Sequence, residues 1–221
     1  MRCKMNYYIP KGKAEKKLWD EANNIFEELL NDLKSKNMIR LTTIKMDRER
    51  LVSIWQNSDR FGKARNEFLN AIYPDKAKEF SEKSGLADET IVYVHLTQLV
   101  SLALIDYESV FKTSLLFFLE EEQEIRRDMT LTQLLKAIVG ISPIAGKKLK
   151  KLIDTDLRNS LAHGTFWFKH DKMFLAKNSY LQEVREMSLA DFMKESKRIN
   201  VIAHAFTYTL GKKINEGFFK P

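Results

Sequence analysis

Residues 143–176, PIAGKKLKKLIDTDLRNSLAHGTFWFKHDKMFLA, contain the change of pattern that decides the fold. Residues that favour helix follow Pro143, which is well suited to the first turn of a helix. The pattern continues to His163, and the next residue, Gly164, is a natural C-terminal stop. The sequence therefore predicts one helix over residues 143–163 that ends in the segment RNSLAHG.

Directly after this stop, the residues change from helix-favouring to aromatic and apolar. Two such runs, at residues 165–169 and 172–176, are separated by the turn-prone pair His170 and Asp171. Short runs of this composition on either side of a turn are typical of two paired strands. We expect a small β-hairpin after the motif helix.

Outward from this stretch, apolar residues recur at the spacing of helical faces along most of the chain. Thr130 with Gln133 fits a capping box, and Ser188 with Asp191 is a plausible cap for the last helix. With few Gly and Pro residues, the chain belongs by pattern to the all-α class, or nearly so. The expected helices cover residues 13–36, 47–55, 61–73, 88–120, 130–140 and 188–215, and residues 38–46 form a short strand or an extended link.

The segment at residues 79–88 contains Ser and Gly residues and has the composition of a connection. It suggests a boundary near Gly85. On this division, residues 1–84 form an N-terminal helical segment packed on the bundle, and residues 85–221 form the main helical domain.

Composition limits the classes of protein that the chain can belong to. Cys3 is the only cysteine, so the chain alone can build neither a disulfide framework nor a zinc cluster of thiolates. The first residues lack the apolar core of a secretory signal, and polar residues interrupt the longest apolar stretch, at residues 91–119. We expect a cytoplasmic protein with no membrane span.

The net charge of +7 favours an anionic partner, although 30 acidic residues offset most of the 37 basic ones. The excess is concentrated in one window. Residues 145–172 contain seven bases and three acids, which accounts for +4 of the net charge. A solvated helix face is the alternative explanation of such a run.

Three residues of the segment RNSLAHG can carry chemistry. Asn159 and His163 are four apart and share one helical face, while Arg158 is turned away from His163 by roughly 140°. An imidazole can take or give a proton at neutral pH, and a guanidinium matches the oxygens of a phosphate. Because RNA carries its own nucleophile in the 2′-hydroxyl, these groups make a minimal site for cleaving RNA.

This arrangement resembles the HEPN family, whose RNA-cleaving members carry an Arg, a polar residue beside it, and a His after four to six intervening residues. The matching residues here are Arg158, Asn159 and His163, and the resemblance covers residues 86–217. It implies a helical bundle with an N-terminal helical extension. It also implies metal-independent cleavage without a cofactor, by a homodimer in which two copies of the motif face one composite site.

Other residues are candidates for supporting roles. Glu108 and Lys112 are four apart on the long helix, and the resemblance implies that a polar residue there supports the site. The bland alternatives are that these two simply form a pair, and that Arg158 forms an exposed ion pair with Asp154. The candidate substrate-binding residues are Lys147, Lys148, Lys151 and His170.

Two hypotheses of function follow. The first is a metal-independent endoribonuclease that cleaves RNA through attack of the 2′-hydroxyl; by resemblance, such an enzyme serves as a toxin or defence effector restrained by an antitoxin or another regulatory protein. The second is a non-catalytic HEPN-like module that binds RNA, a nucleotide or a partner protein. The chain contains no HExxH, CxxC, P-loop or GxSxG pattern, so metalloprotease, zinc-finger, P-loop and serine-hydrolase functions lack support.

Overall fold

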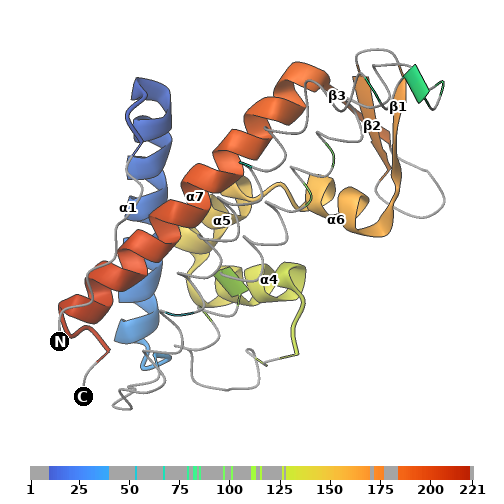
Figure 1. Ribbon diagram of the computed structural model, residues 1–221. Helices are drawn as coiled ribbons and strands as arrows, with labels where there is room; N and C mark the ends of the chain where they lie inside the picture. Colours follow the sequence, from blue (N-terminus) through green and yellow to red (C-terminus); the bar gives the residue numbers. More distant parts are fainter. Residues whose placement is uncertain are drawn as a thin grey trace. The chain divides into compact units, whose positions relative to one another are not determined.

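The computed structural model (Figure 1) describes four longer stretches of the chain, with two pairs of residues and several single residues between them. The stretches are residues 10–39, 128–169, 172–176 and 184–219, with residues 82–83 and 111–112 and the isolated positions 53, 67, 79, 85, 97, 101, 115 and 126. The described part is mostly helical and contains one small three-stranded sheet. None of its helices combines the length and the apolar character needed to span a bilayer.

The chain divides into two compact units, each built from separate stretches of sequence. Unit 1 comprises residues 1–55, 107–154 and 198–221, and unit 2 comprises residues 56–106 and 155–197. Both units combine segments from before and after residue 85.

Helix α1 (Lys13–Ser35) supplies one wall of the core of unit 1. Its apolar stripe is buried, and Phe26 contacts both Phe111 and Phe206, with ring centroids 6.1 and 4.9 Å away. The left-handed residue Asn37, just beyond the C-cap Lys36, has a φ of 57° and allows the Met38 amide to donate to the Leu33 carbonyl. The N-terminal helix therefore contributes buried residues to the core of unit 1.

Helices α4 (Leu131–Ile141) and α5 (Pro143–Leu152) follow each other in unit 1, and α5 also packs on α1. The capping box that Thr130 and Gln133 predicted is present at the start of α4. Close approach of the two helices requires Gly146, because a Cβ there would lie 2.7 Å from the Cα of Val139.

The expectation of one helix over residues 143–163 was wrong. The helix breaks after Leu152, where Ile153 is buried in an extended conformation, and α6 (Thr155–His163) begins as a separate helix. The residue types at the break account for it, since Asp and Thr are preferred where a helix begins. Burial of the Ile153 side chain favours the extended conformation over another helical turn.

In unit 2, α6 leads into an antiparallel sheet with the order β1-β2-β3 (Figure 1). The strands β1 (Phe166–Lys169) and β2 (Lys172–Ala176) confirm the predicted hairpin. A third strand, β3 (Val184–Ser188), extends it. The sequence did not predict this strand. Of its five residues, VREMS, three are exposed and only Met187 is buried.

The last helix, α7 (Leu189–Asn215), begins in unit 2 and continues in unit 1. Ser188 caps it as predicted: its hydroxyl accepts from the Asp191 amide at 3.1 Å and donates to the Asp191 carboxylate at 2.8 Å. Figure 1 shows the part of α7 in unit 1 crossing α1, where Thr209 donates to Asn23 at 2.7 Å. The predicted helices at residues 47–55 and 61–73, and most of that at 88–120, lie outside the described residues.

Candidate functional site

The segment RNSLAHG forms the last turns of α6, and its final residue ends the helix. Gly164 has a φ of 66°, and the Thr165 amide donates to the Ser160 carbonyl at 2.9 Å. This is the hydrogen bond of a Schellman C-cap, which needs a left-handed residue that Gly provides at little steric cost. The predicted stop at Gly164 is confirmed, and it turns the chain from α6 into β1.

Ser160 attaches the motif helix to the sheet. It is 1% exposed, and its hydroxyl donates to the carbonyl of Ala176, the last residue of β2, at 3.0 Å. Thr165 donates to the same carbonyl at 3.1 Å, and the Ala176 amide donates to the Thr165 carbonyl at 2.9 Å. These three bonds hold the end of α6 against the end of β2, so the position of His163 is tied to the sheet.

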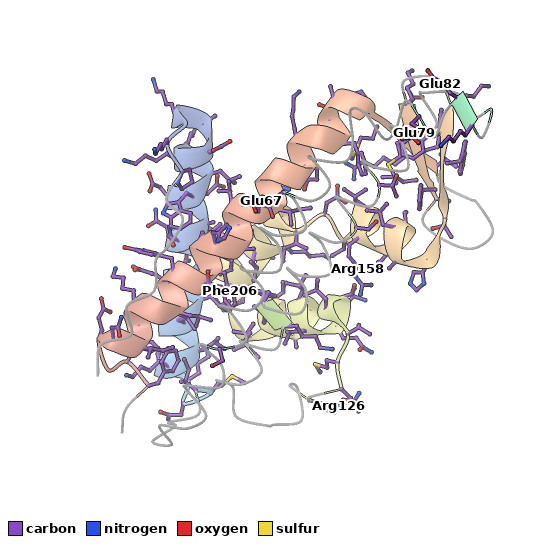
Figure 2. The ribbon with its side chains drawn as sticks, viewed as in Figure 1. Glu67, Glu79, Glu82, Arg126, Arg158 and Phe206 are labelled. Atoms are coloured by element: carbon purple, nitrogen blue, oxygen red, sulfur yellow. The ribbon has the colours of Figure 1, made fainter. Side chains whose placement is uncertain are left out.

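Arg158 and Asn159 are paired with each other. The Arg158 Nη1 donates to Asn159 Oδ1 at 2.9 Å, and both side chains are partly exposed. Since a guanidinium can only donate, the amide oxygen must face Arg158, which leaves the Asn159 amide nitrogen as a donor directed elsewhere. Asn159 thus orients Arg158, a role that the sequence did not suggest. Figure 2 labels Arg158 where it extends from α6.

His163 is the last helical residue and is exposed. Among the residues that the structure describes, none forms a hydrogen bond or an ion pair with its imidazole. Asn159 lies one helical turn before it, so the amide and the imidazole share a face of α6 as expected. A ligand can therefore reach the imidazole and the Arg158–Asn159 pair from the same end of one helix.

The candidate lysines lie on α5, in unit 1, whereas the motif lies in unit 2. Lys147, Lys148 and Lys151 are all exposed. Lys148 forms an ion pair with Glu28 of α1 at 2.7 Å, with half of its side chain still exposed. Part of the predicted basic surface is therefore engaged in holding α5 against α1.

The remaining candidates cannot be assembled into the site from the described residues. His170 and Glu108 lie outside them, and Lys112 is described as a half-buried helical residue of unit 1. One residue of the candidate site, Ser160, was not among the candidates. No local pattern could have found Ser160, because its hydroxyl donates to the carbonyl of Ala176, 16 residues along the chain.

Within the described part of the chain, no group of three or more His, Cys, Asp or Glu side chains is arranged to hold a metal ion. No family model matches this chain, and the comparisons with curated proteins and with solved structures also find no match.

Proposed function

We propose that this protein is a metal-independent endoribonuclease with a HEPN-like helical fold, whose site is built from Arg158, Asn159 and His163. The observation that carries the proposal is the arrangement at the end of α6. There the exposed imidazole of His163 lies within two turns of Arg158, whose Nη1 donates to Asn159 Oδ1 at 2.9 Å. The Ser160 and Thr165 hydroxyls fasten this helix end to the sheet, which favours a fixed geometry over a mobile one.

The chemistry assigned to these residues requires two proton transfers. The 2′-hydroxyl of one nucleotide loses its proton and attacks the adjacent phosphorus, and the 5′ oxygen of the next nucleotide leaves and takes a proton. The products are a 2′,3′-cyclic phosphate and a 5′-hydroxyl. Arg158 offsets the negative charge that develops on the phosphate oxygens, and Asn159 keeps the guanidinium in place.

One imidazole cannot act as base and acid in the same step. A homodimer that brings two copies of His163 to one phosphate would supply both, so the proposed active form is a dimer with a composite site. Mixing inactive Arg158→Ala and His163→Ala subunits tests this arrangement. The proposed site needs His163 from both copies, so mixed dimers should stay inactive. Recovered activity would show that one His163, with Arg158 from the other copy, is sufficient, and it would contradict this arrangement.

The main experiment incubates purified protein with end-labelled RNA in EDTA and identifies the cleaved ends. We expect cyclic-phosphate ends from the wild type. We expect His163→Ala to cleave about 100- to 10,000-fold more slowly, the range for loss of a general acid or base, and Arg158→Ala to lose activity to a similar degree.

The chain offers a matched control on α7. Arg198 and His204 are separated by five residues, almost the same spacing as in the motif, but Arg198 donates to the Lys151 carbonyl at 3.2 Å. Arg198→Ala and His204→Ala should leave cleavage within a few-fold of wild type. Cleavage that survives in His163→Ala would contradict the site. RNA binding without any cleavage would favour the alternative of a non-catalytic binding module, and growth arrest on expression that His163→Ala relieves would support a toxin.

A further inference from the structure

The sheet of unit 2 has two different faces. Directly paired residues of antiparallel strands lie on the same face. On one face, Phe168 packs on Phe192 with ring centroids 6.3 Å apart, and its cross-strand partner Met173 is fully buried. The opposite face, here called the aromatic face, includes Trp167, Lys169, Lys172, Phe174, Ala176, Val184, Glu186 and Ser188.

The aromatic face exposes large apolar side chains that the core does not use. Trp167 is 37% exposed and Val184 is 44% exposed. The Trp167 and Phe174 rings are nearly parallel, with an interplanar angle of 7° and centroids 5.4 Å apart. The two rings therefore stack on each other. An exposed indole is a ring on which a nucleobase can stack.

The charges beside these rings favour an anion. Lys169 pairs directly across the strands with Lys172, and like charges in this position are destabilising. Lys172 forms an ion pair with Glu186. Within the part of the chain that the structure describes, Lys169 has no ion-pair partner. A phosphate bound near the two lysines would relieve their repulsion.

We propose that the aromatic face binds single-stranded RNA, with a base stacked on Trp167 and a neighbouring phosphate on Lys169 and Lys172. Only unpaired bases offer a free ring face, so duplex RNA should bind less tightly. Trp167 is four residues from His163, which limits their Cα atoms to roughly 14 Å apart, within the reach of a short oligonucleotide. The inference rests on the proposed function in its choice of RNA, but binding here does not require cleavage.

The test uses the His163→Ala variant in EDTA, so that the RNA stays intact. Anisotropy of a labelled single-stranded oligouridylate, and of a labelled blunt-ended RNA duplex, gives the two affinities. Adding Trp167→Ala should weaken binding of the single strand about 10-fold or more, while Trp167→Tyr should keep most of it. Lys169→Gln should weaken binding and lower its salt dependence.

Ile144→Ala is the matched control, since Ile144 is an exposed apolar side chain of α5 that is 64% exposed. It should leave the affinity unchanged. Circular dichroism verifies that each variant is folded. An unchanged affinity in folded Trp167→Ala would overturn the inference, as would equal affinity for the duplex and the single strand. A change of oligomeric state without a change in affinity would overturn it too, because the face would then be a subunit interface.

The two proposals fail in distinguishable ways. If the wild type cleaves RNA but Trp167→Ala binds the single strand as tightly as its parent, the ribonuclease stands and the aromatic face is not its RNA-binding surface. If binding depends on Trp167 but the wild type never cleaves, the aromatic face stands and the catalytic assignment fails.

Discussion

At the scale of single residues, Gly164 shows the cost of a left-handed backbone conformation separately from steric clash. A Cβ built on it meets no heavy atom within 4 Å, so space around it is open. Its φ of 66°, however, is a conformation that residues with a side chain adopt only at a cost. A substitution there therefore measures backbone strain without a steric clash.

We expect Gly164→Ala to lower the free energy of unfolding by about 1 to 2 kcal/mol, measured by urea denaturation. Gly140→Ala is the control, because Gly140 lies in α4 with no atom within 4 Å of its Cβ and without a positive φ. It should raise the free energy of unfolding by about 0.5 to 1 kcal/mol. Equal stability of wild type and Gly164→Ala would contradict the left-handed C-cap.

Ser160 tests the attachment of the motif helix. Ser160→Ala should lower the free energy of unfolding by about 1 kcal/mol, because a buried hydrogen bond is lost while the Ala176 carbonyl keeps the Thr165 hydroxyl. Ser35→Ala removes a bond of the same type, 2.8 Å long, from an exposed site and should change stability by less than about 0.5 kcal/mol. Equal losses in the two variants would show that burial of Ser160 does not matter.

At the scale of elements, the cap of α7 makes stability depend on pH. The Ser188 hydroxyl, and then Lys194, hold the pKa of Asp191 below its ordinary value of 3.8. Because the folded-state pKa is lowered, the stabilisation is present above pH 3.8 and is lost as the pH falls through that lower folded-state pKa.

Asp191→Asn should therefore lower the melting temperature near neutral pH and lower it less in acid well below pH 3.8. Thermal scans at the two pH values measure this. Ser188→Ala removes the main cause of the lowered pKa and should reduce the pH-dependent part of the difference. A difference between Asp191→Asn and wild type that is the same at both pH values would contradict the role of the carboxylate.

The packing of α4 on α5 provides a second prediction for elements. A Cβ on Gly146 would lie 2.7 Å from the Cα and 2.9 Å from the amide nitrogen of Val139. These are backbone atoms of α4, so they can move only if the helix moves with them. Gly146→Ala should therefore separate the two helices and lower the free energy of unfolding by about 1 to 3 kcal/mol. Gly140→Ala, on the facing helix, should do the opposite. A stabilised Gly146→Ala variant would show that the helices are not this close.

At the scale of the whole molecule, unit 1 depends on an aromatic cluster from three distant parts of the chain. Phe26, Phe111 and Phe206 are all buried, and the Phe111 and Phe206 centroids lie 4.7 Å apart. Figure 2 labels Phe206 on α7, close to α1. Each of these rings contacts the rings of the other two segments, so each contributes to holding the three segments together.

Phe206→Ala should lower the free energy of unfolding by about 3 to 5 kcal/mol, since it removes a large buried ring and leaves a cavity. Ile144→Ala, at an exposed position, should change it by less than about 0.5 kcal/mol. Chemical denaturation of both variants makes the comparison. A loss below about 1 kcal/mol in Phe206→Ala would mean that the cluster does not hold unit 1 together.

The sequence by itself determined the local features whose causes lie within a few neighbouring residues. The capping residues Thr130 and Ser188, the stop at Gly164 and the β1–β2 hairpin all belong to this group. Each depends on a hydrogen bond or a backbone conformation formed between close neighbours, so residue type and spacing were sufficient to predict it. The motif RNSLAHG was likewise visible as a short pattern on a helix.

Only the tertiary structure decided the features that depend on distant segments. The burial of Ile153 splits the expected helix, and pairing with β2 makes a strand of the charged segment VREMS. The sheet also decides the orientation of Trp167, because its neighbour Phe168 is used by the core around Phe192. These outcomes arise from packing and pairing across long sequence separations, where local propensity is overridden by burial.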